Sequence, residues 1–167
     1  MRSTLKLLAL ILVMGFMACG GEEKKEETSK IKLQRQKTEK KVEKKAEGIP
    51  ASKRIALNDK GVGPIKTLTL DESINQDMVT HGADVFKKMC TACHKVGKKF
   101  IGPAPNNILE RRSPEWVMNM ILDPEKMVKE DKLARDLLIE FNGSPMANQN
   151  LSEEDARAVL EFFRTLK

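Results

Sequence analysis

Three residues able to bind a metal or a cofactor lie together in the segment MCTACHKVG, residues 89–97. Cys90 and Cys93 are three positions apart, and His94 follows the second cysteine directly. These residues could form a redox-active dithiol, half of a tetrahedral zinc site, a disulfide or an attachment site for haem. The rest of the sequence has to discriminate between these four chemistries.

Haem attachment is the chemistry that uses all three residues. A redox dithiol of the thioredoxin type requires a strand-to-helix junction in an α/β unit, and no parallel-strand pattern is present. Zinc requires three or four ligands, and the further candidate is His81. A Cys90–Cys93 disulfide leaves His94 without a role. Cysteines one helical turn apart can instead bond both vinyl groups of one porphyrin edge, with His94 as an axial iron ligand. We therefore predict one covalently bound haem c.

The net charge of +6 is concentrated at the front of the chain. Residues 1–70 contain 16 Lys and Arg against 8 Asp and Glu, whereas residues 71–167 contain 14 against 16. A nucleic-acid-binding domain needs a basic surface on its folded part. Because the basic excess precedes the haem motif, we predict no nucleic-acid partner.

The first 18 residues have the features of a secretory signal peptide. Arg2 and Lys6 precede an apolar run, residues 7–18, which is shorter than the roughly 20 residues of a membrane-spanning helix. The run closes at FMACGG, which resembles the lipobox of bacterial lipoproteins. This resemblance implies cleavage before Cys19, lipidation of that cysteine and anchoring to a bacterial membrane on the periplasmic side. A soluble secreted protein and an uncleaved anchor are the alternatives.

Residues 19–60 are predicted to form a charged, flexible linker behind the lipidated cysteine. Between residues 22 and 47 the sequence is mostly Lys, Glu, Gln, Ser and Thr. Such a composition buries too little apolar surface to offset the entropy lost on ordering. The segment VGPIKTLTL then begins with a Gly-Pro turn signal, and we expect an extended strap over residues 61–74 that leads into the folded domain.

Residues 75–167 carry the periodicity of short amphipathic helices. Ser113 and Asp123 each precede a proline, and Ser152 is followed three positions later by Asp155, which are signals for helix starts. No strand pattern of useful length is present, so we predict an all-α domain packed around one haem. The expected helical segments are SINQDMVTHGADVFKKMC, RRSPEWVMNMIL, DPEKMV, DKLARDLLIEF and LSEEDARAVLEFFRTL.

Residues from about 75 to 167 resemble a class I, mono-haem c-type cytochrome. The family's first helix carries a glycine and an aromatic residue about four positions apart before the haem motif, and this sequence has Gly82 and Phe86 there. The family's last helix crosses the first at that glycine, using an aromatic residue near the chain end, here Phe162 or Phe163. The resemblance implies the cytochrome c fold.

The resemblance also implies the residues around the iron. In the family a Gly-Pro pair follows the motif, and the proline carbonyl accepts a hydrogen bond from the ligand histidine; here the pair is Gly102 and Pro103. A methionine in the loop before the last helix is the sixth iron ligand, and NGSPMANQNLS supplies Met146. A proline often follows this methionine in the family, whereas here Pro145 precedes it. His81 is the alternative for the sixth position.

Three further side chains are candidates for contacts with the haem propionates. By resemblance to some bacterial members of the family, the Trp116 indole N–H reaches a propionate; the alternative is plain packing in the core. Arg111 and Arg112 are the candidates for ion pairs with propionates, and the alternative for at least one of them is a solvated charge at a helix end.

The resemblance implies a single-electron carrier that cycles between Fe(III) and Fe(II) and has no small-molecule substrate. Iron held by His94 and Met146 has no open position, and a thioether ligand favours the reduced form. The implied partners are redox proteins of the respiratory chain, including a reductase or oxidase to which the protein donates electrons. Two alternatives stay open: a haem subunit of a larger complex, and a sensor or peroxidase with a labile sixth ligand.

Overall fold

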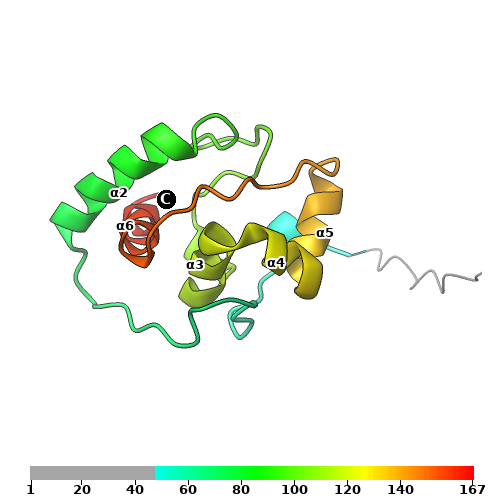
Figure 1. Ribbon diagram of the computed structural model, residues 1–167, viewed down its shortest axis with the longest axis horizontal. Coiled ribbons are helices and arrows are strands. Elements are labelled where there is room, and N and C mark those ends of the chain that lie inside the picture. The colour runs from blue at the N-terminus through cyan, green and yellow to red at the C-terminus, as the bar shows by residue number, and fades with distance from the viewer. Residues whose placement is uncertain (1–47) are drawn as a thin grey trace, which may run out of the picture. The chain divides into compact units, whose positions relative to one another are not determined.

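The computed structural model describes residues 48–167, which form short helices joined by long connections (Figure 1). Within these residues no β-strand is present, and two isolated bridges occur. The all-α prediction is therefore confirmed. The helical elements are η2 (Ala51–Lys53), α2 (Gln76–Met89), η3 (Ile108–Glu110), α3 (Pro114–Leu122), α4 (Pro124–Glu130), α5 (Lys132–Glu140) and α6 (Glu153–Arg164).

Every α-helix in this part of the chain begins at a polar side chain that accepts hydrogen bonds from its first backbone amides. A proline follows the cap in α3 and α4, where its fixed φ suits the first helical turn and no amide hydrogen bond is lost. The helix starts predicted from the sequence are confirmed. The capping residues are Asn75, Ser113, Asp123, Asp131 and Ser152.

Helices α2 and α6 cross in close contact at Gly82 (Figure 1). A Cβ atom at Gly82 would lie 2.0 Å from the backbone oxygen of Ala158, so only glycine allows this approach. One turn later Phe86 is 5% exposed, and its ring centroid lies 5.5 Å from that of Phe162 and 5.7 Å from that of Phe163. The helix crossing expected from the family resemblance is confirmed, and both aromatic residues take part in it.

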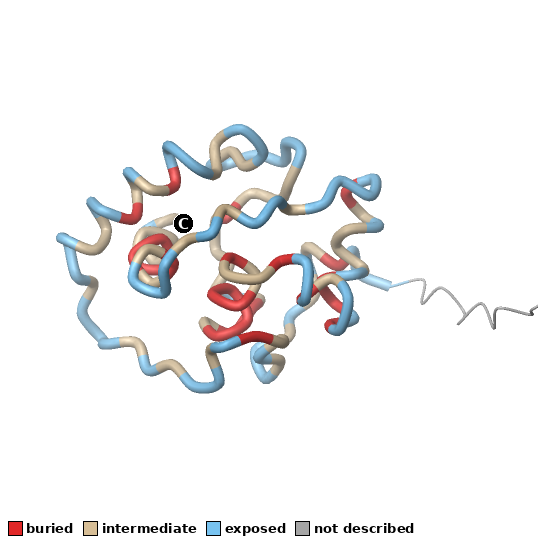
Figure 2. The backbone as a smooth tube through the Cα atoms, in the orientation of Figure 1, coloured by how far each residue is buried: buried red, intermediate tan, exposed pale blue. Residues whose placement is uncertain are grey.

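The buried residues of the domain are concentrated in α3 and α6, whereas the connection between α5 and α6 is largely exposed (Figure 2). Helix α3 packs against both α4 and α6. Its sequence is apolar almost all round, as expected of a helix covered on several sides. The core includes Trp116, Val117, Met118, Ile121, Met127, Leu133, Ala156, Val159 and Leu160.

The folded unit already includes the chain around residues 50–60, so the predicted linker over residues 19–60 ends too late. Ala51 is 3% exposed and belongs to the core. The amide of Ala56 donates to the carbonyl oxygen of Arg111 at 2.8 Å, and Arg54 pairs with Asp136 on α5 at 2.5 Å. Residues 51–56 are therefore held by packing, hydrogen bonding and ion pairing and belong to the folded domain.

The strap predicted over residues 61–74 has no regular secondary structure, and its backbone is hydrogen-bonded to α3. Two polar side chains on α3 accept hydrogen bonds from its backbone: Asn119 Oδ1 from Ile65 N at 2.9 Å, and Glu115 Oε1 from Leu68 N at 3.1 Å. Both side chains are buried, and they satisfy backbone groups that no helix or strand partner serves. The polar positions in this otherwise apolar helix therefore fix the strap.

A buried carboxylate ties the end of the strap to α6. Glu161 is 1% exposed and pairs with Arg157 at 2.5 Å and with Arg164 at 2.7 Å. It also accepts from the amide of Asn75 at 2.9 Å, directly before α2. Burial raises the pKa of Glu161, but the Asn75 amide and the two guanidinium groups lower it by more, so its pKa lies below the ordinary value.

The predicted signal peptide of residues 1–18, the lipidated Cys19 and most of the charged linker lie outside the described residues. Among residues 48–167 no helix is long and apolar enough to cross a membrane.

Candidate functional site: an apolar cavity beside two cysteines and a histidine

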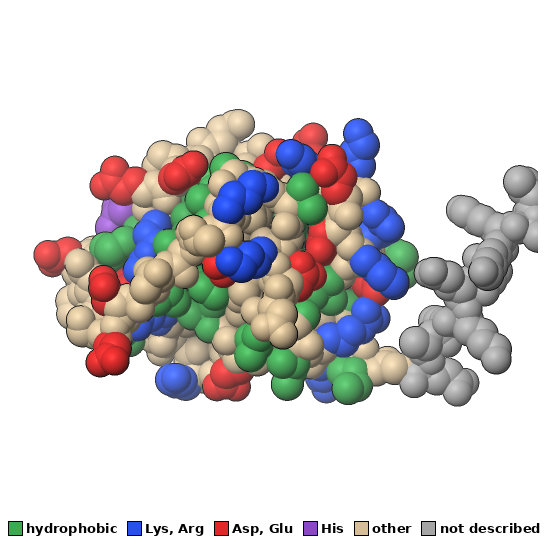
Figure 3. All heavy atoms as spheres, turned by 90° about the horizontal axis from the view of Figure 1, so that it is seen from below, with side chains coloured by type: hydrophobic (Ala, Val, Ile, Leu, Met, Phe, Trp, Pro, Cys, Tyr) green, Lys and Arg blue, Asp and Glu red, His purple; other side chains and the backbone are tan. Residues whose placement is uncertain are grey.

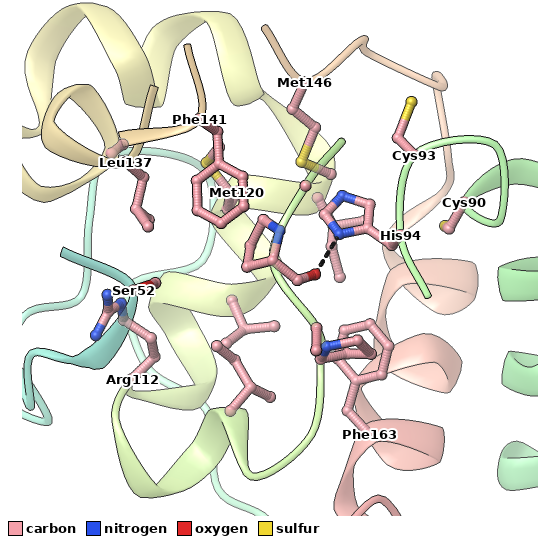
Figure 4. A pocket seen from close by; sticks show the side chains of 18 of the residues that line it. Ser52, Cys90, Cys93, His94, Arg112, Met120, Leu137, Phe141, Met146 and Phe163 are labelled. Atoms are coloured by element: carbon pink, nitrogen blue, oxygen red, sulfur yellow. Dashed lines mark hydrogen bonds between the residues drawn. The ribbon is translucent and has the colours of Figure 1, made fainter. Parts of the chain in front are cut away.

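A large apolar cavity opens between the end of α2, helices α3, α5 and α6, and the loop before α6 (Figure 4). Its empty volume is about 1230 Å³, including the space open to solvent at its mouth. Ligand pockets of proteins are lined mainly by apolar side chains with a few polar groups, and the lining of this cavity has that character, so it suits a mainly apolar ligand. Its walls include Ile108, Val117, Ile121, Leu137, Leu138 and Val159.

Both motif cysteines border this cavity and are free thiols. Cys90 caps the C-terminal end of α2, and the amides of Cys93 and His94 donate to its carbonyl oxygen at 3.1 and 2.8 Å, which continues the chain as a tight turn. Burial and the neighbouring Cys93 raise the pKa of the Cys90 thiol to about 11. Redox-active dithiols need a lowered thiol pKa and occur at helix N-termini. The site has the opposite properties, which argues against the dithiol alternative.

His94 is held in one orientation by its contacts with residues 102 and 103. Its Nδ1 atom lies 2.8 Å from the carbonyl oxygen of Pro103. Because a carbonyl only accepts, Nδ1 carries the proton and the Nε2 lone pair is free to bind a metal. Gly102 packs against the ring: a Cβ there would lie 2.5 Å from His94 Cε1. The sequence pointed to the Pro103 contact through the family resemblance but gave no sign of this second role for Gly102.

Met146 reaches the same cavity from the loop between α5 and α6. Figure 4 shows its side chain and that of His94 extending into one space beside Cys93. Met146 is half-buried although the residues on either side of it are exposed. Met120 also lines the cavity, from α3. Met127 is fully buried, and its sulfur accepts from the amide of Val62 at 3.0 Å, so it serves the core.

The Trp116 indole has a different partner from the propionate suggested by the resemblance. Its Nε1 donates to Asp131 Oδ1 at 3.3 Å, and the side chain is 4% exposed. Burial and the nearby Asp59 raise the pKa of Asp131. Trp116 still lines the cavity with its ring. Asp131 caps α5 with the same oxygen, which brings its carboxylate to the indole.

Arg111 and Arg112 lie at the cavity wall, and each has one unsatisfied polar atom. The Nε atoms of both side chains are buried and have no hydrogen-bond partner among residues 48–167. Arg112 is 1% exposed, so the alternative of a solvated helix-end charge does not apply to it. Burial and repulsion from Arg111 lower the pKa of Arg112. Buried N–H groups rarely lack an acceptor, and acceptor groups on a ligand in this cavity would supply one.

His81 lies on the outer face of α2 and does not line the cavity. Its Nε2 atom is 2.8 Å from Asp155 Oδ1 on α6, and its side chain is 52% exposed. This position gives no support to His81 as an iron ligand. In the described part of the chain, no group of three or more His, Cys, Asp and Glu side chains could hold a metal ion without a cofactor.

The residues present fit haem. Two free cysteines stand at one edge of a large apolar cavity, the adjacent histidine has a free Nε2 lone pair, and two buried Arg Nε atoms lack acceptors. Haem has two vinyl groups for thioethers, an iron for the histidine and two carboxylates for the arginines. An all-α fold with this site defines a c-type haem protein.

The comparison with protein families agrees with this class. The family model for cytochrome c matches residues 79–167, and the chain belongs to the cytochrome c family. Members of this family bind covalently attached haem c and generally carry electrons, and their domains are typically extracytoplasmic. The cofactor of this chain is therefore haem c, with Cys90 and Cys93 present for its attachment.

Solved structures of one bacterial protein and its engineered forms are similar to this chain. Cytochrome c from Rhodothermus marinus is 39% identical, with a TM-score of 0.59 over 61% of this chain and 87% of that one. An engineered form of it, Rma TDE, is 38% identical with a TM-score of 0.59 over 61% and 88%. The same engineered form bound to a carbene intermediate is 38% identical with a TM-score of 0.57 over 61% and 88%. Among curated proteins, none matches the chain.

Proposed function

We propose that this protein is a membrane-tethered, single-electron carrier between extracytoplasmic redox partners of a respiratory chain. The observation that carries the proposal is the pairing of His94 and Met146 in one apolar cavity next to the attachment cysteines. Haem supplies the Fe(III)/Fe(II) couple when bound. Two protein ligands on the iron leave no position for a substrate, so a carrier role follows rather than an enzymatic one.

The chain's own residues set the properties of such a site. The Pro103 carbonyl orients His94 and increases its basicity. The thioether of Met146 and the apolar walls favour the reduced iron, because neither compensates the extra positive charge of the ferric form. The same walls offer water few hydrogen-bond partners, and the half-buried Met146 lines the cavity together with His94.

The rim around Cys93 is suited to brief docking of an acidic partner. Cys93 is exposed, and three apolar side chains next to it, Val96, Phe100 and Ile101, are about half exposed. Exposed lysines flank these residues on both sides of the motif, at positions 87, 88, 98 and 99. Another face of the molecule carries acidic and basic side chains interspersed (Figure 3). A basic rim with an apolar centre favours fast, salt-sensitive association with an acidic surface.

Replacement of Met146 tests the ligand assignment. Met146→Ala should abolish the weak charge-transfer absorption that marks thioether sulfur on ferric c-type haem, a property that family resemblance implies. Carbon monoxide should then bind the ferrous protein, and the reduction potential should fall because sulfur stabilises ferrous iron. The fold should survive, since both cysteines and His94 still hold the cofactor.

Met120→Leu is the matched control, because Met120 lines the same cavity but lies on α3. As a volume-conserving swap it should cost less than about 1.5 kcal/mol and leave the absorption intact. If the absorption persists in Met146→Ala and disappears in Met120→Leu, the assignment of Met146 is wrong.

A sensor or peroxidase with a labile sixth ligand is the second candidate. It is favoured by the exposure of the loop around Met146, in which residues 142–145, 147 and 148 are all exposed. A thinly packed loop opens at low free-energy cost. Carbon monoxide binding to the unmodified ferrous protein would support this candidate, whereas indifference to it would support the carrier.

The proposed anchor depends on Cys19. Cys19→Ser should release the haem domain from membranes or leave an unprocessed precursor, and the mature protein should lose the mass of its acyl chains. Membrane fractionation and intact-mass measurement test this. An unchanged membrane fraction with an unchanged mass would exclude lipidation at Cys19.

A further inference from the structure

Residues 50–56, here called the N-terminal segment, are fixed to the surface of α5 although they lie outside the part matched by the family model. Ser52 donates to Glu140 through its amide at 2.8 Å and through its hydroxyl at 2.5 Å. Arg54 pairs with Asp136 at 2.5 Å. Ser52 also lines the haem cavity. The segment is therefore part of the cavity wall and not only a lead-in to the domain.

The backbone of this segment accepts hydrogen bonds from the side chain of Arg112. Arg112 Nη1 donates to the carbonyl oxygen of Arg54 at 2.5 Å, and Nη2 donates to that of Ala51 at 2.6 Å. The guanidinium group also stacks on the Trp116 ring, 5.1 Å from its centroid. Nη1 also donates to the carbonyl oxygen of Arg111 at 2.9 Å, so both Nη atoms have partners and Nε is the nitrogen without one in a residue that lines the cavity.

The charge of this arrangement is only partly balanced within the described residues, because the carboxylates of Asp59 and Asp131 act on Arg112 from beyond ion-pair distance. Arg111 and Arg112 are adjacent, both line the cavity, and neither has a carboxylate within ion-pair distance among residues 48–167. A buried cation is costly unless it is paired. The anionic groups of haem are its two propionate carboxylates, and these match the missing partners in charge and in number.

We propose that the N-terminal segment is a positioning element of the haem site: by holding Arg112 through the carbonyls of Ala51 and Arg54, it fixes a positive charge at the cavity wall that favours reduced iron. The direction follows from Coulomb's law, because ferric iron carries one more positive charge than ferrous iron and is repelled more strongly. The inference deepens the proposed function and rests on it for the redox couple.

The test is a set of four full-chain, haem-loaded variants compared by spectroelectrochemistry. Ser52→Ala with Arg54→Ala removes the side-chain contacts to α5 and leaves Arg112 in place. Arg112→Gln removes the charge, and the third variant combines all three changes. Lys126→Gln, which removes an exposed positive charge on α4, is the matched control.

Arg112→Gln should shift the ferric-to-ferrous ratio at a fixed applied potential toward ferric by roughly tenfold, about 59 mV for one electron. The segment variant should shift it in the same direction by less, and it should add nothing once Arg112 is Gln. Hydrogen exchange of the Ala56 amide, which donates to Arg111, should become faster in the segment variant.

Three results would overturn the inference: faster exchange at Ala56 without a redox shift, unchanged exchange, or an equal shift from the segment changes in the Arg112→Gln background. If Arg112→Gln does not yield haem-loaded protein, the segment variant and the control still show whether either of the first two results occurs. A visible spectrum with both axial ligands in place separates these failures from failure of the carrier proposal, which would already alter the spectrum of the unmodified protein.

Discussion

Whether Gly82→Ala raises or lowers the free energy of unfolding depends on the crossing of α2 and α6. In an isolated helix, alanine is more favourable than glycine by roughly 1 kcal/mol. At this position the added Cβ would lie 2.0 Å from the backbone oxygen of Ala158 and 2.4 Å from its carbonyl carbon. Normal contact requires about 3.5 Å or more between such atoms, so the helices would have to separate by over an ångström.

The expected loss of stability follows from two terms. Overpacking against rigid backbone costs about 1–3 kcal/mol, and the upper part of that range applies because no flexible side chain can move away. The separation also loosens the contacts of Phe86 with Phe162 and Phe163, each worth about 0.5–1.5 kcal/mol. After subtraction of the gain in helix propensity, we expect Gly82→Ala to lower the free energy of unfolding by about 2–4 kcal/mol.

Denaturant unfolding of the haem-loaded protein measures this difference. Thr80→Ala is the control, because Thr80 is exposed on the same helix and the change should stay within about 0.5 kcal/mol. A Gly82→Ala protein as stable as the unmodified one would refute the reasoning, since the two helices could then not approach as closely as described.

Two further substitutions test buried contacts of the domain. Glu161→Gln should lower the free energy of unfolding by about 1–3 kcal/mol near neutral pH, because Arg157 and Arg164 lose their buried partner. The pKa of Glu161 is depressed in the native protein, so its stabilisation is present above the ordinary pKa of 4.5 and is lost as the pH falls through the lower native pKa. Denaturant midpoints of the unmodified and Glu161→Gln proteins, measured against pH, should therefore converge in acid. Parallel curves would contradict the assignment. Gly102→Ala should push the His94 ring off the Pro103 carbonyl and raise the reduction potential, because a less basic imidazole stabilises ferric iron less; an unchanged potential would show that the contact does not control the ligand.

Much of the fold could be predicted because its signals are local. A capping side chain such as Ser113 or Ser152 acts on amides two or three residues away, and a proline acts on the turn that it begins. The roles of Gly82 and Pro103 were predicted through the family resemblance, since neither the long-range contact of Gly82 with Ala158 nor the contact of Pro103 with His94, nine positions away, has a local signal.

What could not be predicted depends on contacts for which neither partner carries a signal in its own stretch of sequence. Arg54 is a linker-like residue in its own neighbourhood and becomes structural only because Asp136 meets it on α5. The partner of the Trp116 indole, Asp131, was likewise not apparent, because the position of Asp131 in the sequence is fully explained by its role as a helix cap. Gly102 gave no signal of its contact with the His94 ring, since a Gly-Pro pair is explained equally well by a turn.

The crossing of α2 and α6 also bears on the order in which haem attachment and helix docking take place. The two helices stand at opposite ends of the family domain, so their contact closes a long loop, and such contacts form slowly because the entropy of closure must be offset first. Until α6 docks, one wall of the cavity is missing, and the cysteines at the end of α2 stay accessible to haem. We therefore expect thioether formation to precede the final helix docking, so that the covalently held haem then acts as a template on which the late-forming half of the chain condenses.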